Sequence, residues 1–110
     1  MVTKELIHRK ERFISGESDA LLIRNATELI ISCPVYRTIE PIRFSIHTST
    51  ESDGRYIEVA NDIVNEGGFI KSLHNFADFV KIQYDLGKNG EAEFAGYVII
   101  KKIENGGNSL

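Results

Sequence analysis

Between residues 80 and 102 the sequence alternates apolar and polar side chains on both sides of a glycine-containing turn. Apolar residues take every second position over 80–86, and the turn spans 87–90. A returning strand over 91–102 then places Ala92, Phe94, Gly96, Val98 and Ile100 on one face and Glu91, Glu93, Ala95, Tyr97 and Ile99 on the other. Because successive side chains of a strand point to opposite faces of a sheet, this pattern predicts two paired strands with one buried face. The pattern also excludes a helix over this region, because an amphipathic helix would need apolar residues every three or four positions. No other feature of the sequence constrains the fold as strongly.

Three further regions are predicted to contain strands. Residues 42–48 show the same alternation, and Asp53-Gly54 provides a turn before a returning strand over 55–60. The β-branched runs 20–24 and 27–35 are predicted to be two more strands, with Asn25 in the turn between them.

Residues 69–79 allow two interpretations. Their apolar residues fall at helical spacing, which is compatible with a helix of two turns. The alternative is a strand over 69–73, a loop, and a second strand that begins at Phe79. We favour the strands, because the flanking segments are β and because Asn75 and Asp78 weaken a short helix.

Turn signals recur throughout the 110 residues, and no repeat or linker divides them. This rhythm predicts an all-β fold, a single antiparallel β-sandwich of jelly-roll type with about seven or eight strands. An extended N-terminal arm is expected over residues 1–16, the sandwich domain over 17–103, and a polar C-terminal tail over 104–110.

The overall charge argues against a nucleic-acid partner. Thirteen Lys and Arg residues against 16 Asp and Glu residues give a net charge of −3, whereas nucleic-acid binding depends on a basic face. No apolar run approaches the ~18 residues of a membrane span, so no membrane partner is expected. Cys33 is the sole cysteine and lies in an apolar run. It is predicted to be buried, in a protein of a reducing, cytoplasmic compartment.

The N-terminal segment differs in charge from the rest of the chain. Residues 1–12 hold four basic and two acidic side chains, a net of +2, which leaves −5 for the remainder. A basic arm can dock on the acidic body of a neighbouring copy. A solvated, frayed terminus explains the same charges. The candidate partner-binding residues of the arm are Lys4, Leu6, Ile7, Arg9, Lys10, Arg12 and Phe13.

Residues that could carry chemistry do not cluster in the sequence. His8, His47 and His74 lie far apart, and no pair of cysteines or histidines has the spacing of a metal site. No serine lies in a nucleophile elbow, and no glycine-rich loop precedes a predicted helix. We therefore predict a protein that is not an enzyme, with no catalytic residue, cofactor or metal site.

Two resemblances follow from the strand pattern. The stretch IHTSTESDGRY over 46–56, the strand over 79–84 and the apolar strand over 94–100 resemble discoidin-like β-sandwich modules across residues 42–102. The chain is too short to hold the ligand loops of such a module, so ligand binding does not carry over.

The overall layout also resembles small virion proteins of tailed bacteriophages, of the decoration (cement) or minor tail and head-fibre type. These are short, cysteine-poor β-sandwiches with a charged terminal arm. The resemblance implies a structural assembly protein, in which the arm and the sheet edges bind copies of the same chain or a larger capsid or tail. It also implies a virion location after assembly in the host cytoplasm.

The alternative is a carbohydrate- or ligand-binding module that uses the loops around 51–54, 62–68 and 87–90. That hypothesis predicts an exposed aromatic side chain beside hydrogen-bonding groups in a concave site.

Overall fold

A computed structural model describes residues 2–12, 15–88 and 90–102, with side chains for all of these except 2–12. The described residues form ten strands and no helix, and hence no helix able to cross a membrane. The strands are β1 (Val2–Arg12), β2 (Ser15–Glu17), β3 (Leu21–Leu22), β4 (Ala26–Cys33), β5 (Val35–Thr38), β6 (Ile42–Ser49), β7 (Ile57–Val64), β8 (Phe69–Leu73), β9 (Phe79–Asp85) and β10 (Glu91–Lys102).

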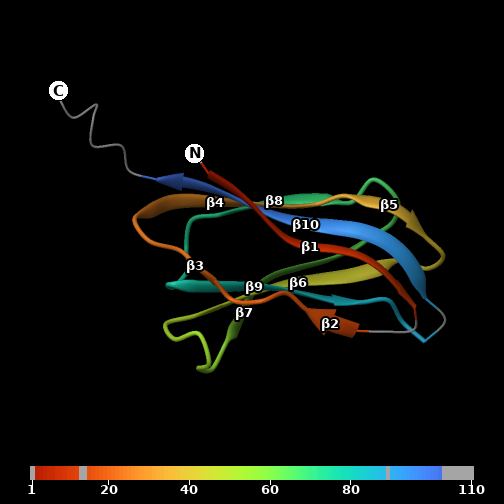
Figure 1. The fold of residues 1–110 in the computed structure, drawn as a ribbon, viewed down its shortest axis with the longest axis horizontal. Coiled ribbons are helices and arrows are strands. Elements are labelled where there is room, and N and C mark those ends of the chain that lie inside the picture. The colour runs from red at the N-terminus through yellow and green to blue at the C-terminus, as the bar shows by residue number, and fades with distance from the viewer. Residues whose placement is uncertain (1, 13–14, 89, 103–110) are drawn as a thin grey trace.

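The strands form two antiparallel sheets that pack face to face (Figure 1). The order in sheet A is β1-β10-β4-β8, and β5 continues the line of β4 along β10. The order in sheet B is β2-β9-β6-β7, and β3 continues the line of β2 along β9. If β4 with β5, and β2 with β3, are each counted as one interrupted strand, each sheet has four strands. The chain visits the sheets in the order A, B, A, B, B, A, B, A, which is the jelly-roll arrangement. The predicted jelly-roll sandwich is confirmed.

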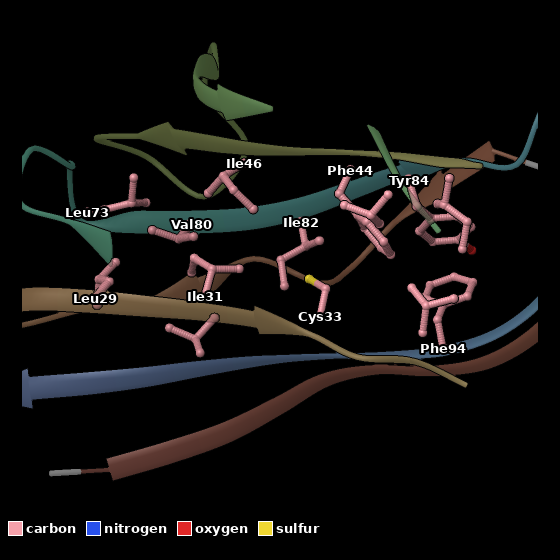
Figure 2. Close-up of a cluster of buried hydrophobic side chains, with 14 of the residues drawn as sticks. Leu29, Ile31, Cys33, Phe44, Ile46, Leu73, Val80, Ile82, Tyr84 and Phe94 are labelled. Atoms are coloured by element: carbon pink, nitrogen blue, oxygen red, sulfur yellow. The ribbon is translucent and has the colours of Figure 1, made fainter. Parts of the chain in front are cut away.

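The core lies between the sheets and consists of the alternate side chains that the sequence pattern predicted (Figure 2). Aromatic rings cross it from one sheet to the other: the ring centroid of Phe94 lies 5.5 Å from that of Phe44 and 4.9 Å from that of Tyr84. Cys33 is buried, as predicted, and burial raises the pKa of its thiol to about 12. The buried apolar residues of β6, β9 and β10 and the turn after β9 are Ile42, Phe44, Ile46, Val80, Ile82, Tyr84, Leu86, Ala92, Phe94, Ala95, Val98 and Ile100.

Two strands are interrupted at residues that explain the break. β4 ends before Pro34, which has no N–H to donate to the sheet. The Pro34 carbonyl oxygen still accepts a hydrogen bond from the Ala95 N–H at 3.0 Å. Between β2 and β3, the Ser18 hydroxyl oxygen accepts a hydrogen bond from the Ile82 N–H at 2.9 Å and so replaces a main-chain partner. These breaks account for the ten strands in place of the expected seven or eight.

The local predictions for the middle of the chain are confirmed. Residues 69–79 form β8, a loop and the start of β9, not a helix. Asn25 has a φ of 57° in the turn between β3 and β4, a left-handed conformation that asparagine tolerates well. The returning strand predicted over 55–60 is β7, which begins and ends a few residues later.

The segment 1–16, predicted to be an arm outside the sandwich, instead joins the sheets for most of its length. β1 is extended, but its backbone pairs with β10 of the same chain, from Val2 opposite Ile100 to Arg12 opposite Glu91. This pairing gives partners to the main-chain N–H and C=O groups of both strands, which explains why the segment does not project away. The predicted boundary at residue 17 falls inside β2. Phe13 and the tail 104–110 lie outside the described residues.

Candidate functional site

The outer face of sheet B carries a groove that crosses all four strand lines of the sheet. The groove has a volume of about 480 Å³, within the ~300–1,000 Å³ typical of small-ligand sites. We call it the sheet B groove, and its lining residues are Ser15, Gly16, Glu17, Arg43, Ser45, Glu58, Gln83, Tyr84 and Asp85.

Strand register places the lining side chains in rows across the sheet. Glu17 pairs with Gln83 on β9, Gln83 pairs with Ser45 on β6, and Ser45 pairs with Asn61 on β7. Residues paired in this way share a face, so one polar row runs from edge to edge of the sheet. A second row joins Ser15, Asp85, Arg43 and Ile63, and a third joins Lys81, His47 and Glu58.

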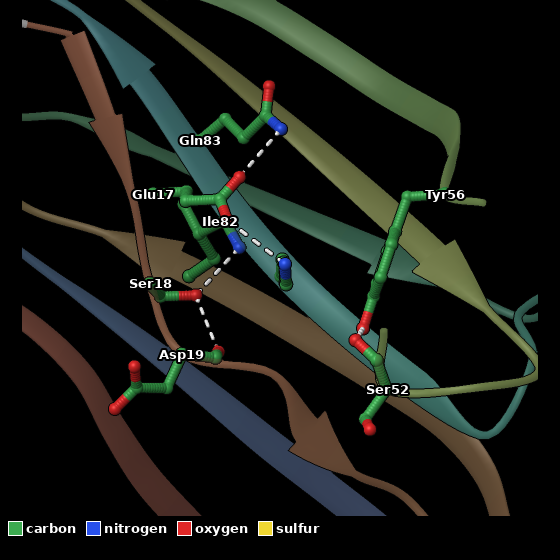
Figure 3. Close-up of polar contacts among 8 residues, drawn as sticks. Glu17, Ser18, Asp19, Ser52, Tyr56, Ile82 and Gln83 are labelled. Carbon is green, nitrogen blue, oxygen red and sulfur yellow. Dashed lines mark hydrogen bonds and ion pairs between the residues drawn. The ribbon is translucent and has the colours of Figure 1, made fainter. Parts of the chain in front are cut away.

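The first row is linked to the third by a charged hydrogen-bond network (Figure 3). The Gln83 side-chain amide donates to Glu17 Oε1 at 3.1 Å, and Lys81 Nζ lies 2.9 Å from Glu17 Oε2. Lys81 Nζ also lies 4.5 Å from the ring centroid of Tyr56, whose hydroxyl donates to the Ser52 carbonyl oxygen at 2.8 Å. The network holds Glu17 and Gln83 in fixed positions at one end of the groove.

The other end of the groove is held by contacts within β6, within β7 and between the two strands. Asn61 Nδ2 donates to Glu58 Oε2 at 2.7 Å, and His47 Nε2 lies 2.9 Å from Ser45 Oγ and 3.9 Å from Glu58 Oε1. Arg43 is exposed, and within the described part of the chain its guanidinium group makes no ion pair, although Asp85 is its neighbour on β9. The groove thus offers one guanidinium group to a ligand among prearranged carboxylates and amides.

The ion pair between Glu17 and Lys81 shifts the pKa of both groups. Its hydrogen bond lowers the pKa of Glu17 below the ordinary 4.5 and raises the pKa of Lys81 above the ordinary 10.5. Because the Glu17 pKa is lowered, the pair stabilises the fold above pH 4.5 and loses this contribution as pH falls through the folded-state pKa. The same ion pair also loses its stabilising contribution at alkaline pH. Because the Lys81 pKa is raised, this loss occurs as pH rises above 10.5 through the folded-state pKa of Lys81.

Lys81→Met should therefore raise the pKa of Glu17 towards 4.5. We expect a stability loss of no more than about 1 kcal/mol, because both groups face solvent. An NMR titration of the side-chain carboxyl carbons measures the shift. Glu28 is the internal control: Lys101 Nζ lies 3.0 Å from Glu28 Oε1 on sheet A and likewise lowers the pKa of Glu28. Lys81→Met should leave the Glu28 titration unchanged, and equal movement of both carboxyls would contradict the assigned pairing.

The predicted partner-binding residues and the groove lie on different parts of the molecule. Lys4, Leu6, Ile7, Arg9, Lys10 and Arg12 are in β1, at the edge of sheet A, and their binding to a partner stays a prediction. The loops 51–54, 62–68 and 87–90 contribute no described residue to the groove lining. Gly67 and Gly68 instead line a smaller hollow beside Pro34 and Ile70. The aromatic residue of the groove lining, Tyr84, is only 4% exposed and does not provide the exposed ring that the ligand-binding hypothesis expected.

Sequence reasoning identified none of the groove residues as a site. The available signal was the outward register of 43, 45, 83 and 85, which follows from the same alternation that predicted the core. In the described part of the chain no three His, Cys, Asp or Glu side chains gather as a metal site.

No protein-family model matches the chain, and no curated protein matches its sequence. Among solved structures, the chain is similar to one described as "CBM4 structure and function", with a TM-score of 0.43 and 14% sequence identity. The alignment covers 79% of this chain and 59% of the other, so this chain spans less than two thirds of that protein. The resemblance to phage virion proteins finds no support in these comparisons.

Proposed function

We propose that the protein is a non-enzymatic binding module and that its sheet B groove takes a short, neutral oligosaccharide. The observation that carries this proposal is the composition of the groove lining. An amide, two serine hydroxyls, a guanidinium group and three carboxylates line one open groove that crosses the whole sheet.

These side chains complement the hydroxyl groups of a sugar, each of which both donates and accepts hydrogen bonds. Carboxylates accept, a guanidinium group donates in a planar fork, and an amide does both. Because the side chains of Glu17, Gln83 and Glu58 already hold one another or their neighbours, little further ordering is needed when a ligand binds.

The charge of the groove favours a neutral sugar over an acidic one. Glu17, Glu58 and Asp85 against Arg43 give a net of −2 by subtraction, and the Lys81 ammonium group that pairs with Glu17 leaves a net of −1. A uronic acid or a sulfated glycan would meet like charges on three of the four strand lines. Because no exposed aromatic ring lines the groove among the described residues, binding rests on hydrogen bonds that replace water, and we expect a Kd near 1 mM, or about −4 kcal/mol.

A glycan array with neutral and acidic oligosaccharides, followed by isothermal titration calorimetry on the best ligand, tests the proposal. We expect neutral glycans to bind and the double variant Arg43→Ala, Gln83→Ala to bind them at least about tenfold more weakly, since each loses about 1 kcal/mol or more of hydrogen bonding. Arg24→Ala, in the exposed turn between β3 and β4, is the matched control and should bind as the unmodified protein does. Absence of any bound glycan, a preference for acidic glycans, or undiminished binding by the folded double variant would overturn the proposal.

A further inference from the structure

The sandwich has two open sides, each bordered by the edge strands of its two sheets. β7 and β8 are consecutive strands and border one side, since β7 ends sheet B and β8 ends sheet A. β1 and the β2–β3 line border the other side. Edge strands present unpaired main-chain N–H and C=O groups, and a long exposed edge can pair with another chain.

The edge strands β7 and β8 contain most of the large apolar residues that the described part of the chain leaves exposed. Seven such residues are exposed in all, and Ile57, Val59 and Ile63 on β7 and Ile70 on β8 are four of them. The exposed fractions of Ile57 and Ile63 are 65% and 54%. Strand register places Ile63 beside Arg43 on the outer face of sheet B and Ile70 beside Ser32 on the outer face of sheet A, so the apolar residues flank the two edges and the pairing argument rests on the edges and their charge.

The two long edges have opposite charge. Residues 51–66, which comprise β7 and its flanking turns, contain five acidic residues and Arg55, a net of −4 by subtraction. β1 contains four basic and two acidic residues, a net of +2. Like edges therefore repel, and pairing of β7 with a second β7 or of β1 with a second β1 is disfavoured. Pairing of β1 with β7 brings opposite charges together.

We propose that copies of this chain assemble head to tail, with the free edge of β1 in one copy paired to the free edge of β7 in the next. Because the two surfaces differ, the contact is heterologous and leaves one β1 edge and one β7 edge free at the ends of every open chain of copies. Charges on an edge strand usually prevent pairing with other chains. Here they disfavour pairing between two like edges and favour pairing of the basic β1 edge with the acidic β7 edge. The inference is independent of the proposed groove ligand.

Two charge-reversed proteins test the assembly without changing the groove lining. The first carries Glu51→Lys, Asp62→Lys and Glu66→Lys, which change the net charge of residues 51–66 from −4 to +2 by subtraction. The second carries Lys10→Glu and Arg12→Glu in β1, at positions that pair with Glu93 and Glu91 of β10 outside the buried core, and its β1 changes from a net charge of +2 to −2. Sedimentation velocity over a range of protein concentrations and at low and high salt measures the assembly. We expect the unmodified chain to self-associate at low salt and to dissociate near 1 M salt, where the Debye length falls to about 3 Å.

Each reversed protein alone should associate at least about tenfold more weakly, because like charges then meet at the contact. An equimolar mixture should regain association, since the reversed β7 of the first protein then meets the reversed β1 of the second. Lys88→Glu with Lys102→Glu, two reversals outside β1 and residues 51–66, is the control and should assemble as the unmodified chain does.

A monomeric unmodified chain at low salt, or unchanged assembly of either reversed protein, would overturn the inference. So would a mixture that stays monomeric while circular dichroism shows both proteins folded. Glycan binding by the same variants reports on the groove separately.

Discussion

Gly68→Ala should strongly destabilise the protein. The residue has a φ of +91°, and a Cβ at this position would lie 1.9 Å from the Cys33 carbonyl oxygen. The left-handed backbone costs about 1–2 kcal/mol for alanine, and the forced displacement of β4 adds about 1–3 kcal/mol. Against a total stability of about 5–15 kcal/mol, a loss of this size is readily measured by urea unfolding followed by circular dichroism.

Gly67→Ala is a matched control one residue away. Gly67 also has a left-handed backbone, with a φ of +101°, but a Cβ there would meet no atom within 4 Å. Its cost should be confined to the backbone conformation, about 1–2 kcal/mol. Equal losses for the two variants would show that the turn does not lie against Cys33 in solution.

Phe94→Ala should lower the free energy of unfolding by an amount comparable to that of Gly68→Ala, for a different reason. The Phe94 side chain is fully buried, and its ring packs against both Phe44 and Tyr84 on sheet B. Removal of a buried phenylalanine ring leaves a cavity and costs about 3–5 kcal/mol. A thermal melt should show this as a fall in Tm of roughly 10 °C or more.

Two variants calibrate the measurement at Phe94. Phe94→Leu keeps most of the volume and should cost less than about 1.5 kcal/mol. Ile39→Ala removes an apolar side chain that is 63% exposed and should change stability by no more than about 0.5 kcal/mol. A Phe94→Ala loss as small as that of Ile39→Ala would mean that the two sheets do not pack through this ring.

The fold could be predicted from the sequence wherever burial acts on one face of a strand. β6, β9 and β10 each bury one face, so their apolar residues recur with a period of two. β1 shows no such period. Lys4, Ile7 and Arg9 all pair with the interior register of β10, so charged and apolar residues alternate irregularly on the same register of β1. What places β1 in the sheet is a main-chain partner about ninety residues away, and main-chain pairing leaves little trace in side-chain type.

The groove could be predicted only in part. Alternation fixes Arg43, Ser45, Gln83 and Asp85 on outward positions, yet it does not state which strands lie side by side. The order β2-β9-β6-β7 unites residues from four separate stretches of chain, and that order follows from long-range packing. The expected ligand loops were chosen for their turn residues, whereas the polar rows of the sheet face form the larger hollow.

The position of β10 also bears on how the protein is made. β10 is the last strand of the described chain, yet it lies in the middle of sheet A, with β1 on one flank and β4 and β5 on the other. Sheet A therefore cannot assemble on the ribosome until residues 91–102 have emerged from the exit tunnel. Until then the apolar side of β4 has no complete layer to join, so the nascent chain exposes apolar surface and is prone to aggregation up to that point.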